Sequence, residues 1–144
     1  MELTIRPARK RDTNKFSEIY YSEFSKLDRN WTRATSRARI RQAIASYPSL
    51  CFALEFDGKI IGFVLAERLD FAKGKHLYLA DLAVSSKYQR KGFGEQALRH
   101  LFKIAKRRGY KSIYLNAIRV GPVLKLYRKV GFRQTKYVHM EKAL

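Results

Sequence analysis

The segment from His76 to Ala117 constrains the fold more than any other part of the sequence. A β-rich run, His76–Val84, leads into a turn that contains two glycines, Gln89–Gly94, and a second β-rich run follows at Lys111–Ala117. Between them, apolar residues recur at helical spacing and predict an amphipathic helix that ends at Gly109. The predicted buried side of this helix consists of Phe93, Ala97, Leu98, Leu101, Phe102, Ile104 and Ala105. Such a helix has to bury its apolar side against another layer of the fold.

The other segments predict a mixed sheet with helices packed on it. Strands are predicted at Leu3–Arg6, Cys51–Phe56, Lys59–Leu69 and Phe132–Lys142. Helices are predicted after a cap at Asp12 or Thr13, from Thr32 to Ser46, and through Leu124 and Tyr127 up to Gly131. Asp57-Gly58 favours a tight hairpin turn, because the central residues of that turn need a positive φ. The order β-α-α-β-β-β-α-β-α-β predicts a single α/β domain over residues 1–144.

Composition excludes several classes of protein. The chain has 144 residues, 31 of them Lys or Arg and 12 of them Asp or Glu, which gives a net charge of +19, yet 46% of the residues are hydrophobic. This apolar fraction excludes a disordered basic tail. No apolar run approaches the ~18 residues of a membrane span, and the N-terminal segment lacks the apolar stretch of a signal peptide. The only cysteine, Cys51, suits a reducing compartment, so we expect a cytoplasmic protein without a metal site or a disulfide.

The positive charge is unevenly distributed along the chain. Residues 87–111 contain nine basic and one acidic side chains, whereas residues 51–86 contain four basic and five acidic ones. The two ends, 1–50 and 112–144, each carry a net charge of +6. A nucleic-acid binder, a pocket for one polyanionic cofactor and a well-solvated surface all fit this distribution. The local sequence of the charged segment has to decide between them.

The turn Gln89–Gly94 favours a phosphate site. Its glycines let the backbone approach a ligand closely, and the free N–H groups at a helix N-terminus attract phosphate oxygens. Arg90 and Lys91 add positive charge at the same place. The segment from Gly92 to Ala97 also fits the loose dinucleotide fingerprint, but no acidic residue occurs between Glu95 and Glu141 to hold a ribose. A nicotinamide or flavin enzyme is therefore not expected, and the sequence contains no P-loop motif.

Three motifs, taken in order, are similar to those of one enzyme family. Leu82–Gly94 (LAVSSKYQRKGFG) resembles the central motif of the GNAT N-acetyltransferases, a strand followed by [QR]-x-x-G-x-[GA] at a helix start. Tyr127–Phe132 resembles the later Y-x-x-x-G-F segment of this family, and Met140–Leu144 resembles its closing strand. The resemblance covers nearly the whole chain. It implies the GNAT fold, a six- to seven-stranded mixed sheet flanked by about four helices.

The resemblance also implies an acetyl-CoA site and a proton donor. In the family, acetyl-CoA lies where two neighbouring parallel strands splay apart, and the matching strands are His76–Val84 and Lys111–Ala117. The backbone of Leu82, Ala83 and Val84 would pair with the pantetheine arm as an added strand does. The pyrophosphate would bind to the turn residues Gln89, Arg90, Lys91, Gly92, Phe93 and Gly94. Tyr127 stands where a tyrosine of the family commonly protonates the coenzyme sulfur, although its position alone would also suit a core aromatic.

The general base is left open between two readings. Asp81 adjoins Leu82 on the motif strand and could accept the amine proton directly or through water, but a hydrogen bond within the sheet is an equal alternative. Relatives that modify protein N-termini often have a glutamate on the next strand, where this sequence has Asn116, which cannot act as a base. A further departure is Val120, where many relatives have an asparagine.

Two functions of different classes fit the sequence. The first is transfer of the acetyl group of acetyl-CoA to a primary amine, on a protein, a peptide or a small molecule, by direct attack in a ternary complex. The second is a basic nucleic-acid- or ribosome-binding domain with the acetyltransferase fold and little or no catalysis. The resemblance implies that the acceptor meets the loop Leu27–Trp31 and the region of Tyr137. The net charge would repel polyamines and lysine-rich tails, and we expect a monomer or a homodimer.

Overall fold

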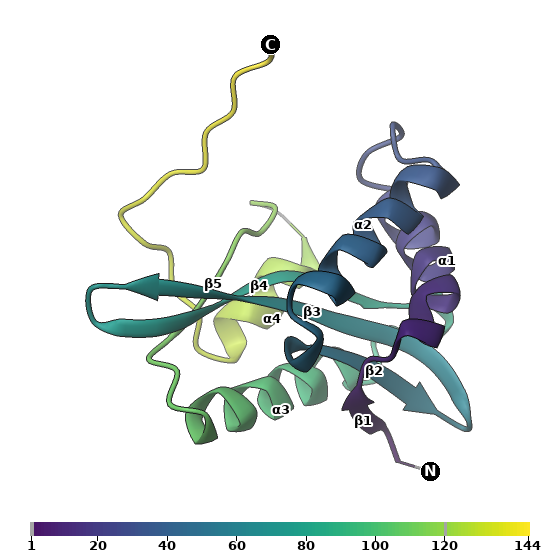
Figure 1. Cartoon of the computed structure of the whole chain (residues 1–144), viewed down its shortest axis with the longest axis horizontal. Coiled ribbons are helices and arrows are strands. Elements are labelled where there is room, and N and C mark those ends of the chain that lie inside the picture. The colour runs from purple at the N-terminus through teal and green to yellow at the C-terminus, as the bar shows by residue number, and fades with distance from the viewer. Residues whose placement is uncertain (1, 120) are drawn as a thin grey trace.

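A computed structural model describes residues 2–119 and 121–144 as one five-stranded sheet with helices on both faces (Figure 1). The strands are β1 (Thr4–Pro7), β2 (Cys51–Phe56), β3 (Lys59–Phe71), β4 (Gly74–Val84) and β5 (Ile113–Leu115). The helices are α1 (Thr13–Phe24), α2 (Arg33–Ser46), α3 (Phe93–Arg107) and α4 (Pro122–Lys129), and short 3-10 turns occur at Lys10–Asp12, Pro48–Leu50 and Ser86–Tyr88. The strands follow chain order in the sheet, antiparallel from β1 to β4 and parallel between β4 and β5. This mixed arrangement confirms the predicted fold class.

Each face of the sheet buries its own apolar cluster. On one face, α1 and α2 contribute Phe16, Ile19, Tyr20, Ile40 and Ala43, which pack on β2 and β3. On the other face, α3 and α4 contribute Phe93, Ala97, Leu98, Leu101, Ala105 and Tyr127. The predicted buried side of α3 is confirmed, with Phe102 and Ile104 partly buried at its border. No helix of the described residues is long and apolar enough to cross a membrane.

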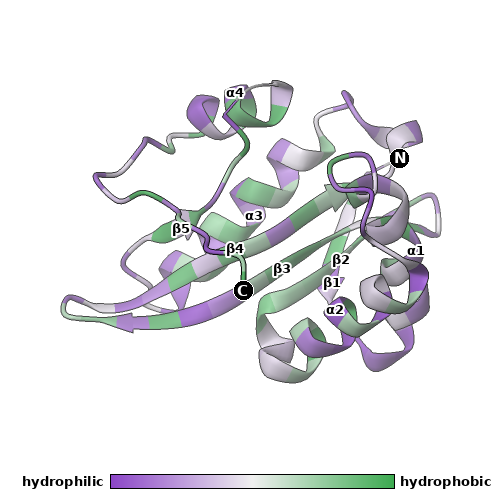
Figure 2. Ribbon diagram, turned by 90° about the horizontal axis from the view of Figure 1, so that it is seen from above, coloured by the Kyte–Doolittle hydropathy of each residue, from purple (hydrophilic) through white to green (hydrophobic). Residues whose placement is uncertain are grey.

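The long hairpin of β3 and β4 crosses the whole molecule and changes character along its length. The half of β3 nearer to β2 is buried from Ile61 to Ala66, whereas the outer half, from Glu67 to Phe71, is largely exposed. Figure 2 shows the corresponding change, with more hydrophilic residues towards the tip of the hairpin. At the start of β3, Asp57 and Gly58 both have a positive φ, of 54° and 71°, which confirms the predicted tight turn.

An irregularity in β4 determines where the sheet opens. Leu65 of β3 faces Asp81, but the next residue, Ala66, faces Leu79, so Ala80 is an extra residue that forms a β-bulge in β4. On the other side of β4, parallel pairing with β5 covers only Leu77 to Leu79. The bulge and the end of the parallel pairing therefore coincide, and β4 beyond Leu79 has no β5 residue beside it.

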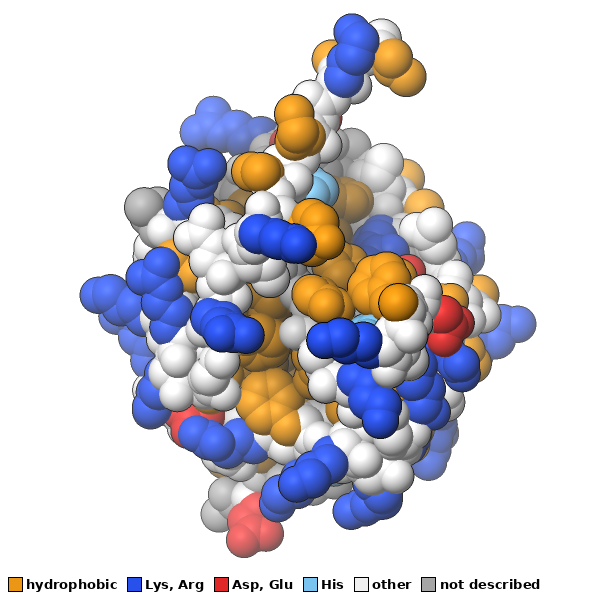
Figure 3. Space-filling view, turned by 90° about the vertical axis from the view of Figure 1, so that its left-hand side faces the viewer, with side chains coloured by type: hydrophobic (Ala, Val, Ile, Leu, Met, Phe, Trp, Pro, Cys, Tyr) orange, Lys and Arg blue, Asp and Glu red, His pale blue; other side chains and the backbone are white. Residues whose placement is uncertain are grey.

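The last segment of the chain differs from the prediction. Phe132–Lys142 was expected to close the sheet as a strand, but residues 132–144 form no strand, so the sheet has five strands instead of six or seven. The physical reason lies in β5, whose three residues offer little backbone for a further strand to pair with. The segment leaves the body of the protein as an extended tail and carries exposed hydrophobic side chains, namely Tyr137, Val138, Met140 and Leu144 (Figure 1 and Figure 3).

We expect that Gly62→Ala lowers the free energy of unfolding by about 1–3 kcal/mol, because it overpacks the sheet. A Cβ atom at Gly62 of β3 would lie 2.3 Å from the Ala83 carbonyl oxygen and 3.1 Å from Leu54 Cδ1. Gly94→Ala is the matched control, since its Cβ would meet only Leu126 Cδ2 at 3.4 Å. Urea denaturation should give a lower midpoint for the first variant alone, and equal midpoints would contradict the close approach.

Candidate active site

The site is built around the edge of β4 that β5 leaves uncovered. Asp81, Leu82, Ala83 and Val84 follow the bulge and pair with β3 on one side only. A backbone edge without a partner strand can pair with an extended, amide-bearing ligand. The structure thus places three of the predicted cofactor residues, Leu82 to Val84, along one open edge that leads towards the turn before α3.

The turn before α3 presents a row of backbone donors. From Arg90 to Glu95, the backbone N–H groups donate no hydrogen bond to any other described residue. The turn reaches this shape through Arg90, at φ 62°, and Gly92, at φ 84°, which is the N-cap of α3. A positive φ suits glycine and costs other residues energy. Because these N–H groups surround the positive end of α3, the turn has the donors and the dipole that phosphate oxygens require.

A carboxylate from α1 holds the turn in place. Glu23, whose side chain is 12% exposed, accepts hydrogen bonds from the Ser86 backbone N–H at 3.2 Å, from the Ser86 hydroxyl at 2.9 Å and from the Gln89 side-chain amide at 3.0 Å. The same Gln89 amide donates to the Val84 carbonyl at 2.6 Å. Glu23 therefore connects α1 to both the end of β4 and the start of the turn.

These contacts change the role expected for Gln89. Its backbone N–H donates to the Ser86 carbonyl at 3.3 Å and its side chain faces Glu23 and Val84, so its polar groups have partners within the protein. Phe93 is similar, since its ring is buried against Phe56 with centroids 4.9 Å apart. Gln89 and the Phe93 ring shape the site, and the exposed cations Arg90 and Lys91 flank its free N–H groups.

The one acidic residue in the first turn of α3 is neutralised by its neighbours. Glu95 accepts from Lys129 of α4 at 2.8 Å and from Arg99 at 3.0 Å. These partners, Lys129 first, lower the pKa of the Glu95 carboxyl. The negative charge of Glu95 thus opposes a bound phosphate less than its position near the turn would suggest.

Asp81 lies beside the open edge and is paired with a cation from α2. Its Oδ2 accepts hydrogen bonds from Arg39 Nη2 at 2.9 Å and from Arg39 Nε at 3.1 Å. The Asp81 side chain is 11% exposed and the Arg39 side chain is 22% exposed. Burial raises the pKa of Asp81 above its ordinary value, while Arg39 counteracts this rise and Glu67 adds to it. A carboxylate whose pKa lies closer to neutrality is a better proton acceptor.

Tyr127 approaches the same region from the opposite face of the sheet. It belongs to the α3 cluster and is 8% exposed, with its ring packed against Phe132 at 5.6 Å between centroids. Burial raises the pKa of Tyr127 to about 12, and the charge of Asp81 contributes to the rise. The hydroxyl donates to no other described residue and stays protonated at neutral pH, so it is available to donate a proton.

The two residues singled out on the acceptor side, Trp31 and Tyr137, lie in different surroundings. Trp31 packs edge-on against Tyr20 with centroids 4.8 Å apart, and Tyr137 lies on the extended tail. Asn116, directly after β5, donates its side-chain amide to the Tyr78 hydroxyl at 2.9 Å. Val120, noted as a departure from relatives, lies outside the described residues.

Two residues of the site had no clear signal in the sequence. Glu23 stands in the last turn of α1, and Arg39 is one of several arginines in α2. Neither belongs to a motif, and both become significant only because α1 and α2 pack over the end of β4. The one available signal was helical spacing. Arg39 does not lie on the helix face that Arg33, Arg37 and Arg41 share at intervals of four residues.

Comparison with known proteins identifies the family. The profile described as the acetyltransferase (GNAT) family matches residues 13–132, and the chain therefore belongs to this family. The family uses acetyl-CoA as acetyl donor, so the predicted cofactor is confirmed at the family level. A search of curated proteins found no match.

Solved structures with low sequence identity share the fold. A ribosomal-protein-alanine N-acetyltransferase from Brucella melitensis biovar Abortus 2308 has 19% identity and a TM-score of 0.82, with 99% of each chain covered. An aminoglycoside acetyltransferase in complex with sisomicin, from an uncultured soil metagenomic sample, has 20% identity and a TM-score of 0.76, with 99% of this chain and 96% of that chain covered. A predicted acetyltransferase with acetyl-CoA from Clostridium acetobutylicum has 19% identity and a TM-score of 0.73, with 97% and 96% covered.

We expect that Glu23→Ala weakens acetyl-CoA binding by about tenfold, which corresponds to about 1.4 kcal/mol and to the loss of hydrogen bonds to a charged group. The turn loses its anchor while its own N–H groups remain, so KM for acetyl-CoA should rise more than kcat falls. Calorimetric titration and steady-state kinetics measure the two effects. Glu18→Ala on the exposed side of the same helix is the control, and an equal effect of both variants would contradict the anchoring role.

Proposed function

We propose that this chain transfers the acetyl group of acetyl-CoA to a primary amine by direct attack in a ternary complex. The observation that carries the proposal is the open edge of β4. This edge runs from the ion pair of Asp81 and Arg39 to the free N–H groups of the α3 turn. Tyr127 lies close enough for the charge of Asp81 to raise its pKa. A phosphate site, an edge for an amide-bearing arm and two proton-transfer groups thus adjoin. An amine acetyltransferase needs these parts.

The binding roles follow from the backbone. The N–H groups of Arg90 to Gly94 would hold the pyrophosphate, with the Arg90 and Lys91 side chains adding positive charge. The open edge from Leu82 to Val84 would hold the pantetheine arm, although Gln89 already occupies the Val84 carbonyl. When bound, acetyl-CoA supplies an acetyl group activated as a thioester.

The proton-transfer roles follow from the two buried groups. Asp81 would accept, directly or through water, the proton that the acceptor amine loses, since one of its oxygens, Oδ1, is free of the Arg39 contacts. Tyr127 would donate its hydroxyl proton to the departing sulfur, because burial keeps this hydroxyl protonated. Positioned acid–base groups of this kind typically contribute about 10²–10⁴-fold to a rate.

Direct attack is favoured over a covalent acetyl-cysteine intermediate. Cys51 is the only cysteine, and its side chain is fully buried in the α1–α2 cluster. Burial raises the pKa of the Cys51 thiol to about 11, so almost none of it is thiolate at neutral pH. The acetyl group would therefore pass to the acceptor amine without resting on a thiol of the protein.

The class of acceptor is a primary amine. This is supported by two structural neighbours, one named as a ribosomal-protein-alanine N-acetyltransferase and one as an aminoglycoside acetyltransferase in complex with sisomicin. The alternative of a nucleic-acid-binding domain without catalysis gains no support from the family assignment, and it would leave the Asp81 and Tyr127 groups unused.

We expect that Tyr127→Phe lowers kcat by about 10²–10⁴-fold while acetyl-CoA affinity stays within about threefold, because it removes only the proton donor. Thiol release from acetyl-CoA, measured over a panel of small amines, amino acids and N-terminal peptides, supplies the rate. Tyr110→Phe, at the opposite end of α3, is the control. A full rate in Tyr127→Phe would remove this residue from the mechanism, and absence of turnover by the wild type on the whole panel would contradict the proposal.

We expect that Arg39→Gln moves the acid limb of the pH–rate profile to higher pH by about 1 unit or more. Asp81 accepts a proton only when ionised, so activity falls as pH drops through its pKa, and loss of the opposing Arg39 charge raises that pKa further. The measurement is kcat/KM against pH. Arg68→Gln, which breaks an exposed pair with Asp70, is the control. An unmoved acid limb in a folded Arg39→Gln protein would show that Asp81 is not the base.

A further inference from the structure

We propose that the outer surface of α1 and α2 binds single-stranded RNA in a basic groove. Two adjoining hollows, of about 470 Å³ and about 710 Å³, lie along the seam between these helices and share Asn14 and Arg37. We call them together the α1–α2 groove. Its lining includes Lys10, Arg11, Asn14, Arg33, Arg37 and Arg41.

The charge in this groove is strongly one-sided. It contains the cations Lys10, Arg11, Arg33, Arg37 and Arg41 and a single acidic side chain, Glu18. In the described part of the chain, none of these cations is within ion-pair distance of a carboxylate. A concave surface with one sign of charge focuses the electrostatic field and attracts a polyanion.

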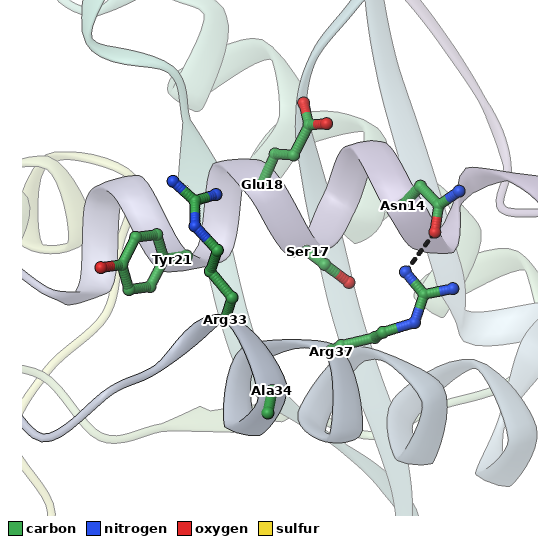
Figure 4. A pocket seen from close by; sticks show the side chains of 7 residues that line it. All are labelled: Asn14, Ser17, Glu18, Tyr21, Arg33, Ala34 and Arg37. Carbon is green, nitrogen blue, oxygen red and sulfur yellow. Dashed lines mark hydrogen bonds between the residues drawn. The ribbon is translucent and has the colours of Figure 1, made fainter.

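Two arginines of the groove, Arg33 and Arg37, are organised by contacts with α1. Figure 4 shows Arg33 and Arg37 reaching from α2 towards α1, where Arg37 donates a hydrogen bond to the Asn14 side-chain oxygen. The Arg33 guanidinium lies over the Tyr21 ring, 4.7 Å from its centroid. These contacts span the seam and hold the charges at fixed places, which differs from the freely solvated basic face that the spacing of Arg33, Arg37 and Arg41 alone would suggest.

The chemistry of the groove favours a phosphodiester backbone. Four of the five cations are arginines, whose planar donor fork suits phosphate oxygens. Arg33, Arg37 and Arg41 follow one another by four residues, about 6 Å along the helix axis, and so form a row of charge for a repeating anion. Beside this row lies the Tyr21 ring, which carries the Arg33 guanidinium over one face, and aromatic and arginine side chains together are typical of single-strand sites.

Other anionic surfaces fit this groove less well. A membrane surface calls for exposed apolar side chains that insert between lipids, and the large exposed hydrophobics of the described residues, such as Leu27, Phe71 and Met140, lie outside the groove. Asn14 and Glu18 offer a polar rim in which a ribose 2′-hydroxyl can donate to the carboxylate, whereas deoxyribose cannot. We therefore infer RNA rather than DNA.

The test measures binding of a short fluorescent single-stranded RNA by anisotropy across a salt series. In the variant Arg33→Gln, Arg37→Gln and Arg41→Gln, we expect at least tenfold weaker binding at low salt. The log–log salt slope should become shallower by about 2, since each phosphate contact on a single strand contributes about 0.7. The matched control, Lys103→Gln, Lys106→Gln and Arg107→Gln, removes as many exposed charges from α3, within the most basic segment of the sequence.

Each outcome bears on the proposal. Equal losses in both variants would show that diffuse charge and not the groove binds RNA, and would overturn it. Displacement of the RNA by saturating acetyl-CoA would place the RNA at the α3 turn, with the same consequence. Equal affinity for DNA of the same sequence, or preferential binding of polyglutamate or of anionic vesicles, would contradict RNA as the partner.

A second variant protects the test against misfolding. Lys10→Gln with Arg11→Gln removes two exposed charges from the other end of the groove, away from the contacts between the helices. We expect a severalfold loss of RNA affinity from this variant, with acetyl-CoA affinity and the thermal unfolding midpoint unchanged. Unchanged RNA affinity in both groove variants would overturn the proposal.

Discussion

Parallel pairing between β4 and β5 stops at Leu79 and Leu115, and the functional half of the molecule depends on where it stops. The bulge at Ala80 re-aims β4 at the same level, so the strand continues past its neighbour with one edge open. Asp81 is the first residue beyond the bulge to pair again with β3, and the turn before α3 begins where β4 ends. A sheet paired along its full length would leave no open edge between Asp81 and the turn before α3.

The two faces of the sheet have to cooperate for this opening to work. Glu23 and Arg39 come from the helices of one face, while the α3 turn and Tyr127 belong to the other. Glu23 holds the start of the turn through Ser86 and Gln89, and Arg39 holds the carboxylate of Asp81. The packing of α1 and α2 over β4 is therefore as necessary to the site as the glycine turn itself.

The sequence predicted the parts of the fold that local chemistry determines. Asp57-Gly58 favours a tight hairpin turn, and the structure has this turn. The apolar spacing from Phe93 to Ala105 predicts which side of the helix is buried, and the structure buries that side. The closing strand, Phe132–Lys142, failed because pairing depends on the neighbour, and β5 is only three residues long. The contacts of Glu23 and Arg39 could not be predicted from the sequence for a related reason. Arg39 and Asp81 are 42 positions apart, and Glu23 and Ser86 are 63 positions apart, so these pairs meet through packing and not through any local pattern.

The positive charge lies on two separate surfaces, the turn before α3 and the α1–α2 groove, which the net charge alone does not distinguish. The segment 87–111 carries the highest density of charge, yet the α3 turn itself presents mainly backbone N–H groups, with Arg90 and Lys91 as its flanking cations. The five cations of the α1–α2 groove line a different surface and have no carboxylate within ion-pair distance among the described residues. One coenzyme cannot neutralise both surfaces, because it carries only a few negative charges. In the proposed assignment, the polyanion site follows the arginines that converge across the α1–α2 seam and not the segment with the highest charge density.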